Sequence, residues 1–395
     1  MYISDRFQGI ASSPTLAIDA KFKQMKADGM DVVGFGAGEP DFDTPQYIKD
    51  AAIQAINDGF TKYTPASGTV ALKKAVCKKF KRDNGLDYEP NQIVISNGAK
   101  HSLVNVFGAI LNPGDEVVIP APFWVSYPEM VKINFGVPVA LETTEENDFK
   151  FSIDDLKAAI TPKTRAIVIN SPSNPTGMVY TADELKAIAD LAVERDLYVV
   201  SDEIYEHLTY EGTPVSIASF GEEIKKRTII VNGVSKTYSM TGWRIGYTAS
   251  APEIAKAMGN VQSHATSNPN SIAQVAATAA LEGPQDEVAT MKAAFKERRD
   301  YMVERINSID GVSCLKPHGA FYVMMNIKPV IGRELYGHVI TSSDDFAHLF
   351  LEKQLVAVVP GSGFDAEGYL RWSYATSMDN IKRGLDRLEA FLKGE

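Results

Sequence analysis

The sequence predicts an α/β fold in which a mostly parallel sheet is covered by helices on both faces, with a second, smaller α+β domain beside it. Short apolar segments alternate with amphipathic segments through most of the chain, and this order changes after residue 290. A chain of 395 residues also exceeds the length at which one hydrophobic core stops growing. We therefore expect a large domain at 48–290 and a small domain made of 1–47 and 291–395.

Several segments of the large domain are short, continuously apolar and bounded by turn residues, as buried parallel strands are. They are QIVIS (92–96), EVVIP (116–120), RAIVINSP (165–172), LYVVSDE (197–203) and TIIVNG (228–233). Between two of them, TADELKAIADLAVERD (181–196) carries apolar residues at helical spacing. Strands that alternate with helices in this way predict a parallel sheet covered on both sides.

The chain after residue 290 has a different order of elements. KAAFKERRDYMVERI (292–306) predicts a long charged helix, and FYVMMNI (321–327) and VAVVPG (356–361) predict strands. NIKRGLDRLEAFLKG (380–394) predicts a closing helix. We expect the loop-rich stretch before residue 48 to join this smaller α+β domain.

Composition and charge limit the classes of function. The chain is 45% hydrophobic and 23% charged, and its longest apolar runs, such as AIVI (166–169), are too short to span a membrane. We find no secretion signal in MYISDRFQGI, and Cys77 and Cys314 lack CxxC spacing, which indicates free thiols in a reducing cytoplasm. A net charge of −10 works against nucleic-acid binding. We expect a cytoplasmic protein with a small-molecule ligand and with no nucleic-acid or membrane partner.

The glycine cluster GFGAGEPDF (34–42) does not fit a dinucleotide site. Its spacing is GxGxG rather than GxGxxG, and Glu39 and Pro40 stand where a phosphate-binding helix should begin. The sequence contains no GxxxxGK[ST] motif either. These observations argue against the common nucleotide-binding folds.

Acidic residues gather where the strand LYVVSDE ends. Asp202, Glu203, Glu206 and His207 lie close together in VVSDEIYEHLTY; taken alone they fit a solvated helix start or, less well without HExxH spacing, a metal site. Lys236 follows the next strand, and the carboxyl ends of parallel strands converge on one crevice. We therefore expect Asp202 and Lys236 to lie together there, and we expect no metal.

Two further strand ends carry polar groups. SPSNPTG (171–177) has prolines that define a turn, from which Asn174 can donate an amide hydrogen. In SNGAKHS (96–102), Gly98 and Ala99 stand at a predicted helix start, where free backbone N–H groups bind phosphate. Together these strand ends suit one anionic, aromatic ligand.

The chain carries a series of motifs in the order GEPDFDTP, APFWVSYPEM, NSPSNPTG, SDEIYEHLTYEG, SKTYSMTGWRIGY and RWSYATS. In these motifs it resembles the class I aminotransferases of fold type I, which depend on pyridoxal phosphate, and most of all the bacterial aspartate aminotransferases. The resemblance runs from about residue 12 to the C-terminus. It implies pyridoxal phosphate as the cofactor, and a mostly parallel seven-stranded sheet covered by helices beside a smaller α+β domain.

The resemblance implies catalytic roles for Lys236, Asp202 and Tyr205. Lys236 matches the lysine that forms a Schiff base with the cofactor aldehyde and then moves the proton at the substrate α-carbon. Asp202 would face the pyridine nitrogen and keep it protonated. Tyr205, together with Asn174, would donate a hydrogen bond to the phenolic oxygen of the cofactor.

The resemblance also implies how the cofactor is held. Trp124 would stack on the cofactor ring. Tyr63 matches a tyrosine that reaches the phosphate of the neighbouring subunit, which predicts a homodimer with shared active sites. The phosphate would be bound by Gly98, Ala99, Ser235 and Arg244, with Lys100 beside them.

The implied substrate contacts are few. Arg371 would hold the α-carboxylate as a bidentate fork, with Gly38 as a backbone contact and with Trp124 and Asn174 alongside. The implied reaction transfers the amino group between L-aspartate and 2-oxoglutarate, giving oxaloacetate and L-glutamate by a ping-pong mechanism through pyridoxamine phosphate. Aromatic, alanine or prephenate aminotransferases and β-lyases share the lysine and remain alternatives. A cofactor-sensing transcription regulator would need a DNA-binding domain before this region, whereas here the resemblance begins near Met1.

The group that would bind the distal carboxylate of an acidic substrate is a separate question. In the mammalian-type branch an arginine of the partner subunit does this; the corresponding segment, 245–297, contains no arginine here, and SHATSNPNS (263–271) within it offers only neutral groups and His264. Lys100 is the best candidate, although a place beside the phosphate suits it equally well. If Lys100 serves the phosphate, we expect the side chain to be selected around Ser13 and Thr15.

Overall fold

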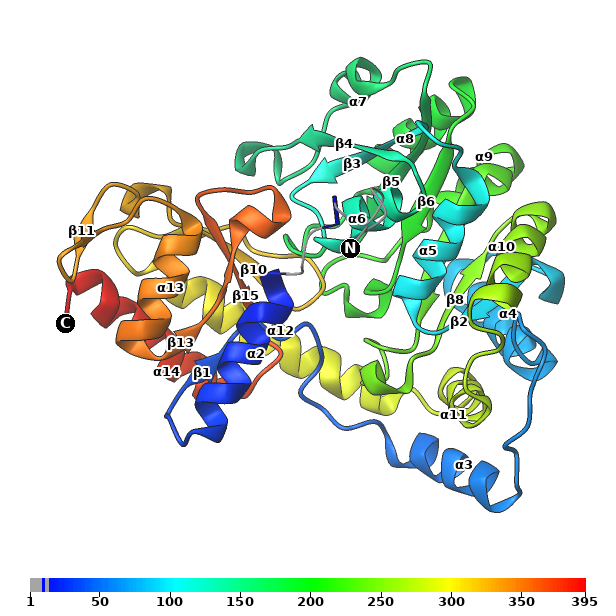
Figure 1. The fold of residues 1–395 in the computed structure, drawn as a ribbon, viewed down its shortest axis with the longest axis horizontal. Coiled ribbons are helices and arrows are strands. Elements are labelled where there is room, and N and C mark those ends of the chain that lie inside the picture. Colours follow the sequence, from blue (N-terminus) through cyan, green and yellow to red (C-terminus); the bar gives the residue numbers. More distant parts are fainter. Residues whose placement is uncertain (1–8, 11–13) are drawn as a thin grey trace, which may run out of the picture.

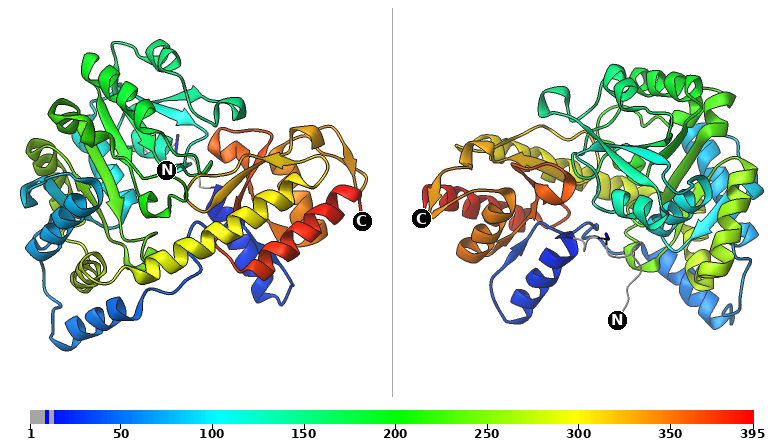
Figure 2. Two further views of the ribbon diagram at one scale, coloured as in Figure 1. Left: turned by 180° about the vertical axis from the view of Figure 1, so that it is seen from behind. Right: turned by 45° about the horizontal axis from the view of Figure 1, so that its top comes forward.

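The computed structural model describes residues 9–10 and 14–395, and it has two regions. In Figure 1 the larger region surrounds a central sheet with helices, and the smaller region holds the C-terminal elements. Helix α12 (Asp286–Asn307) runs from one region into the other, as Figure 2 shows from behind. The division into domains at residues 48 and 290 remains a prediction. Helix α12 continues through residue 290 without a break.

The larger region is built on a seven-stranded sheet with the order β2-β8-β7-β6-β5-β3-β4. Strand β8 runs antiparallel to both of its neighbours, whereas the other neighbouring pairs are parallel. The mostly parallel seven-stranded sheet is therefore confirmed. The strands are β2 (Ile93–Ser96), β3 (Glu116–Ala121), β4 (Val137–Glu142), β5 (Thr164–Asn170), β6 (Tyr198–Asp202), β7 (Thr228–Gly233) and β8 (Gly246–Ala249).

Both faces of this sheet are covered because its central strands are apolar on both sides. On β5, Val168 packs in one cluster with α5, α6 and α10, whereas Ile167 and Ile169 pack in another with α8. Successive side chains of a strand point to opposite faces, so a continuous apolar run needs helices on both. The helices of this region are α3 (Gln46–Asn57), α4 (Val70–Asn84), α5 (Ala99–Ile110), α6 (Ser126–Ile133), α7 (Ile153–Ala159), α8 (Ala182–Glu194), α9 (Glu222–Arg227), α10 (Pro252–Ala265) and α11 (Ser271–Glu282).

The smaller region contains an antiparallel four-stranded sheet of order β14-β15-β10-β9. In its core, the ring of Trp372 lies 4.6 Å from that of Phe35 and 6.0 Å from that of Phe350, measured between centroids. Phe35 follows β1 (Val33–Gly34), which pairs in parallel with β13 (Val356–Ala357), so the N-terminal segment contributes to this core. The other elements are α2 (Pro14–Ala27), β9 (Ser313–Cys314), β10 (Tyr322–Asn326), β11 (Glu334–Leu335), β12 (His338–Val339), α13 (Ser343–Gln354), β14 (Val359–Pro360), β15 (Tyr369–Ser373) and α14 (Met378–Lys393).

The structure corrects the expectation for the apolar run VAVVPG. A single strand was predicted over 356–361, but β13 pairs with β1 while β14 pairs with β15 in a different sheet. An apolar run indicates burial and does not identify the pairing partner. The pattern also missed β4, which contains Pro138, and β8 and β15, in which glycine or polar residues interrupt the apolar positions.

The described part of the chain carries no helix that is long and apolar enough to cross a lipid bilayer. Cys77 is half-buried and Cys314 is buried, and both are free thiols, as their spacing predicted. Burial raises the pKa of Cys77 to about 11 and the pKa of Cys314 to about 12. Both thiols therefore stay protonated and unreactive near neutral pH.

Substitution of Gly246 tests whether β8 and the start of α5 lie too close together for a side chain at this position. A Cβ on Gly246 would lie 2.7 Å from the Cα of Ala99, which leaves no room for a side chain. We expect Gly246→Ala to lower the free energy of unfolding by about 1–3 kcal/mol through overpacking, measured by urea denaturation. Gly259→Ala on α10 is the control, because the nearest atom to its Cβ would be 3.7 Å away. Equal losses in the two variants would contradict the steric argument.

Candidate active site

A cavity of about 420 Å³ opens at the carboxyl ends of β5, β6 and β7, between the larger and the smaller region. The strand ends therefore converge as the sequence predicted. Most of the predicted site residues line this cavity, whereas Gly98 borders it and Tyr63 does not reach it. The lining consists of Gly36, Ala37, Gly38, Glu39, Ala99, Lys100, Trp124, Tyr127, Asn170, Asn174, Asp202, Ile204, Tyr205, Ser235, Lys236, Thr241, Arg244, Tyr322 and Arg371.

Asp202 is the last residue of β6 and is 3% exposed. The Tyr127 hydroxyl donates to Oδ2 at 2.7 Å, and the Ile204 amide donates to Oδ1 at 3.2 Å. Burial raises the pKa of Asp202 to about 6, and these hydrogen bonds oppose that rise. The chain then passes into a buried turn and the 3₁₀ helix η3 (Glu206–Leu208), so the solvated helix start that the sequence allowed is wrong.

Lys236 follows β7 and is half-buried. Its Nζ donates a hydrogen bond to the carbonyl oxygen of Gly38, which belongs to the glycine cluster near the N-terminus. Burial lowers the pKa of Lys236 to about 8; the charges of Arg244 and Arg371 act in the same direction, and Glu39 opposes them. A substantial fraction of this amine is therefore uncharged near pH 8, which is the form that reacts with carbonyl groups.

The start of α5 and Arg244 form a corner suited to an anion. Helix α5 begins at Ala99, and its first backbone N–H groups have no partners within the helix. The Arg244 guanidinium is anchored beside them, because Nη1 donates to the Thr241 carbonyl at 2.8 Å and Nη2 to the Asn97 carbonyl at 3.3 Å. Gly98 has a φ of +86°, a conformation that favours glycine, and a Cβ there would also lie 2.8 Å from Arg244 Cζ.

Arg371 on β15 is 2% exposed. Nη1 donates to Oδ1 of Asn174 at 3.0 Å, and Nη2 donates to the carbonyl oxygen of Gly36 at 2.9 Å. Nε is buried without a hydrogen-bond partner among the described residues. A buried cation with unused donor capacity is costly unless an anion binds it, so this guanidinium is suited to a carboxylate ligand.

Trp124 and Lys100 lie together on the cavity wall. The Lys100 ammonium is 4.8 Å from the centroid of the Trp124 ring, and that ring packs edge-to-face on Tyr127 at 5.3 Å between centroids. Burial lowers the pKa of Lys100, and the nearby charge of Arg244 lowers it further. Because Lys100 is close both to an aromatic face and to the anion-binding corner, its two predicted roles, at the substrate and at the phosphate, both stay open.

Sequence analysis missed two tyrosines that line the cavity, Tyr127 and Tyr322. The hydroxyl of Tyr322 lies 2.9 Å from that of Tyr205. Tyr127 stands near Trp124 in APFWVSYPEM, so proximity to a predicted site residue could have indicated it. Tyr322 offers no local signal, since 117 positions separate it from Tyr205.

Other predicted contributors lie outside this cavity or outside the described residues. Tyr63 is 90% exposed, between α3 and α4, so its contribution to a partner's site stays a prediction. Ser13 and the side chain of Thr15 lie outside the part of the chain that the structure describes. Selection of the substrate side chain by these two residues also stays a prediction.

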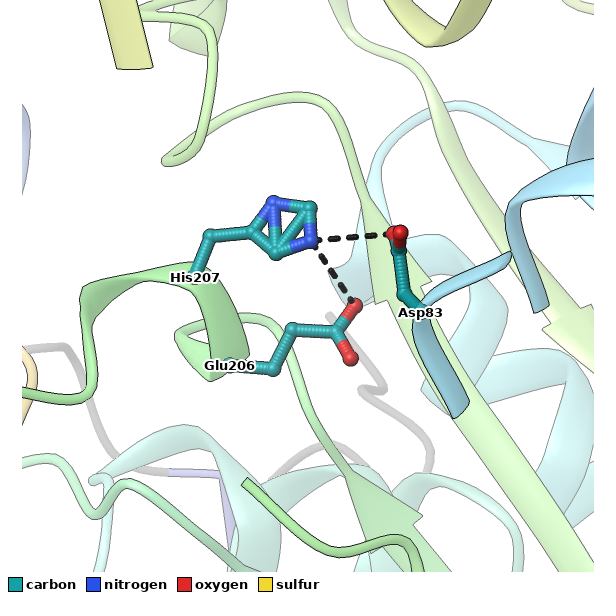
Figure 3. Close-up of side chains that lie close together, drawn as sticks. All are labelled: Asp83, Glu206 and His207. Carbon is teal, nitrogen blue, oxygen red and sulfur yellow. Dashed lines mark hydrogen bonds and ion pairs between the residues drawn. The ribbon is translucent and has the colours of Figure 1, made fainter. Parts of the chain in front are cut away.

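Glu206 and His207 do not line the cavity; they meet Asp83 of α4 (Figure 3). His207 Nε2 is 3.1 Å from Asp83 Oδ2 and 4.0 Å from Glu206 Oε1, a grouping that could hold a metal ion. Glu206, however, forms an ion pair with the buried Lys79 and accepts a hydrogen bond from Asn232 at 2.6 Å. We interpret the group as a buried ion-pair network, because an ammonium already balances the carboxylate.

The fold and the cavity define an α/β enzyme in which a lysine of lowered pKa, a buried carboxylate and two arginines line one cavity. The family described as aminotransferase class I and II matches residues 30–388. The chain belongs to this family of class I and II aminotransferases.

Individual relatives agree with this family over the whole chain. Aspartate aminotransferase from Geobacillus stearothermophilus is 51% identical over 394 residues, which cover 100% of this chain and 99% of the relative. The crystal structure of the aspartate aminotransferase from Rhizobium meliloti has a TM-score of 0.96 at 44% identity, covering 100% of this chain and 99% of that one. The Thermus thermophilus aspartate aminotransferase with maleate has a TM-score of 0.94 at 43% identity, covering 99% of this chain and 100% of that one.

The lowered pKa of Lys236 predicts enhanced reactivity. In ligand-free protein we expect labelling of Lys236 by trinitrobenzenesulfonate to rise with pH around a midpoint of about 8, because only the uncharged amine reacts. Glu39→Gln should move the midpoint to lower pH, since the Glu39 carboxylate favours the charged amine. Mass-spectrometric peptide mapping over a pH series measures the labelling midpoint in the wild type and in Glu39→Gln, with the exposed Lys163 as internal control. Identical pH profiles for Lys236 and Lys163 would contradict the assignment.

Proposed function

We propose that the chain is an aspartate aminotransferase that exchanges the amino group between L-aspartate and 2-oxoglutarate, giving oxaloacetate and L-glutamate in a ping-pong cycle. The observation that carries the proposal is the convergence of Lys236, Asp202, Arg244 and Arg371 on one cavity. Relatives named aspartate aminotransferase, 51% and 50% identical over nearly the full chain, support the choice of substrate.

The cavity residues fit pyridoxal phosphate, on which enzymes of this family depend. The start of α5 and Arg244 offer donors to a phosphate, Asp202 offers a carboxylate to a pyridine nitrogen, and Lys236 offers an amine to an aldehyde. When bound, pyridoxal phosphate supplies an aldehyde and an electron-accepting ring, which carry the amino group from one substrate to the other. The residues proposed to hold it are Gly98, Ala99, Trp124, Asn174, Asp202, Tyr205, Ser235, Lys236 and Arg244, with Lys100 alongside.

Lys236 is proposed to hold the cofactor and to move the proton at the substrate α-carbon. Its pKa of about 8 lies near the working pH of a cell, where one amine can act as base and then as acid. The Gly38 carbonyl accepts a hydrogen bond from Nζ and keeps the amine at the cavity wall. The same loop thus positions the lysine and offers its backbone to the substrate.

Asp202 is proposed to hold a proton on the pyridine nitrogen, for which it must be charged. Burial disfavours its charge and raises the pKa to about 6. The Tyr127 hydroxyl and the Ile204 amide each donate to one carboxylate oxygen and favour the charged form. The charge of this buried carboxylate therefore depends on fixed hydrogen bonds rather than on solvent.

Arg371 is proposed to bind the α-carboxylate that all the substrates share. Asn174 and the Gly36 carbonyl hold two of its nitrogens without neutralising its charge. A planar guanidinium fixed in this way presents parallel donors to a carboxylate. This end of the site selects 2-amino and 2-oxo acids and leaves the choice of side chain to other residues.

Prephenate is a second candidate substrate. A relative from Nitrosomonas europaea, 50% identical over 396 residues that cover 99% of this chain, is named aspartate/prephenate aminotransferase. Aromatic and alanine aminotransferases and β-lyases would use the same lysine and differ at the side-chain end. A point charge at Lys100 would discriminate less sharply among carboxylates than a guanidinium fork does.

We also propose that the enzyme is a homodimer with shared sites. Tyr63 is 90% exposed, and its neighbours in sequence Ile53, Ile56 and Val70 are 53%, 54% and 59% exposed. Apolar side chains left open along α3 and the start of α4 favour contact with another protein surface. Figure 1 shows α3 at the periphery of the molecule, away from both sheets. The dimer and the cytoplasmic location both remain predictions.

Loss of the Lys236 amine tests the proposed reaction. We expect Lys236→Ala to lower transamination by roughly 10²–10⁴-fold or more, because the base that moves the α-proton is gone. Oxaloacetate release from aspartate and 2-oxoglutarate measures it, with alanine, phenylalanine and prephenate as competing substrates. Borohydride treatment of the wild type should leave the cofactor label on Lys236. Lys163→Ala should behave as the wild type, and an active Lys236→Ala enzyme would refute the assignment.

Lys100 tests the recognition of the acidic side chain. If it binds the distal carboxylate, Lys100→Ala should lower kcat/KM for aspartate more than for alanine or phenylalanine, by a ΔΔG‡ of about 1.5–3 kcal/mol. Steady-state kinetics with the three donors measure this difference, and Lys100→Arg should keep part of the preference because it keeps the charge. An equal loss for all three donors, with weaker retention of cofactor, would place Lys100 at the phosphate instead.

A further inference from the structure

Tyr322 occupies a position between two functional groups of the site. It is the first residue of β10, is fully buried, and lines the cavity. Its hydroxyl lies 2.9 Å from the hydroxyl of Tyr205, and its ring centroid lies 4.5 Å from Cζ of Arg371. One side chain therefore touches both the tyrosine proposed for the cofactor and the arginine proposed for the substrate.

The register of the smaller sheet places Tyr322 there. Strand β10 pairs antiparallel with β15, so that Tyr322 lies opposite Ser373 and Met324 lies opposite Arg371. Tyr322 and Arg371 are thus diagonal neighbours on one face of the sheet, a separation that long and aromatic side chains bridge. The aromatic face under the guanidinium adds a cation–π attraction, which is stronger in a buried site.

The hydrogen bond between the two hydroxyls has a consequence for proton donation. A tyrosine has one hydroxyl proton, so Tyr205 can donate either to Tyr322 or into the cavity. If Tyr322 donates to Tyr205, the proton of Tyr205 is free for a ligand, and its oxygen is polarised by accepting a bond. The Arg371 guanidinium packs directly on the Tyr322 ring, so its charge favours Tyr322 as the donor.

We propose that Tyr322 is a positioning residue with two separable functions. Its hydroxyl donates to Tyr205 and directs the Tyr205 proton toward the phenolic oxygen of the cofactor, while its ring orients Arg371 for the substrate α-carboxylate. The inference rests on the proposed function, since it assigns Tyr205 to the cofactor and Arg371 to the substrate. It predicts that removing the hydroxyl and removing the ring have different effects.

Two substitutions separate the functions. Tyr322→Phe keeps the ring and should leave the dissociation constant for maleate, a dicarboxylate that cannot react, within about twofold. It should raise the pH midpoint of the holoenzyme's visible absorption band by about 0.4–1 unit, because the hydrogen bond that stabilises negative charge on the phenolic oxygen is weakened. Tyr322→Leu should also weaken maleate binding by about 2–30-fold, because the cation–π contact is lost.

Tyr374→Phe is the matched control. Tyr374 is buried in the same hydrophobic cluster, and its hydroxyl donates to the Ala320 carbonyl at 3.2 Å rather than to a site residue. This variant should shift neither the absorption midpoint nor maleate affinity, although it removes the same atom from the same core. Circular dichroism and thermal unfolding establish that each variant is folded before its spectrum is titrated.

The outcomes distinguish a failure of the proposed function from a failure of the role proposed for Tyr322. A wild-type protein without a visible absorption band and without transamination would overturn the proposed function. A normal wild type whose midpoint is unchanged by Tyr322→Phe would overturn the role of the hydroxyl alone. If Tyr322→Leu does not fold, Tyr322→Phe still decides, because weakened maleate binding in that variant would contradict the assignment of Arg371 orientation to the ring.

Discussion

Three cations, Lys236, Arg244 and Arg371, line one cavity without carboxylate partners among the described residues, and the rest of the site depends on how they are held there. The charges of Arg244 and Arg371 help to lower the pKa of Lys236, after burial itself. None of the three forms an ion pair with a carboxylate in the described part of the chain. A carbonyl dipole orients a cation without cancelling its charge, so the cavity stays attractive to anions in a protein of net charge −10. The carbonyl oxygens that hold these cations belong to Gly36, Gly38, Asn97 and Thr241.

The acidic segment after β6 shows how similar side chains acquire different roles. Asp202 turns into the cavity, whereas Glu203 accepts hydrogen bonds at 2.9 Å and 2.7 Å from two buried serines. Glu206 pairs with Lys79 and accepts from Asn232 on β7. Each buried carboxylate has its own donors, which is the condition for burying several acids together. The bond from Glu206 to β7 also ties the turn that carries Tyr205 to the strand that delivers Lys236.

Local patterns of the sequence predict much of this fold and part of its site. A continuous apolar run marks a buried strand, and polar residues at its end or shortly after it mark the edge of the sheet, which is why Asp202 and Lys236 could be placed in one crevice. The periodicity of a strand does not identify the strand with which it pairs. The antiparallel β8 and the division of VAVVPG between two sheets were therefore not predictable from local patterns. Tyr322 reaches the site only through the register of β10 on β15, a contact between distant segments.

The two side chains proposed for the ends of the substrate, Arg371 and Lys100, differ in rigidity. Arg371 is buried on a strand and fixed by Asn174 and a backbone carbonyl, so it would present one fixed geometry to the α-carboxylate proposed for it. Lys100, on the first turn of α5, would offer only a point charge on a flexible stem. Under the proposed assignment, substitutions around Lys100 would alter the choice of side chain while Lys236 and Arg371 keep their places. This division of labour agrees with relatives of 51% and 50% identity that are named for aspartate alone or for aspartate and prephenate.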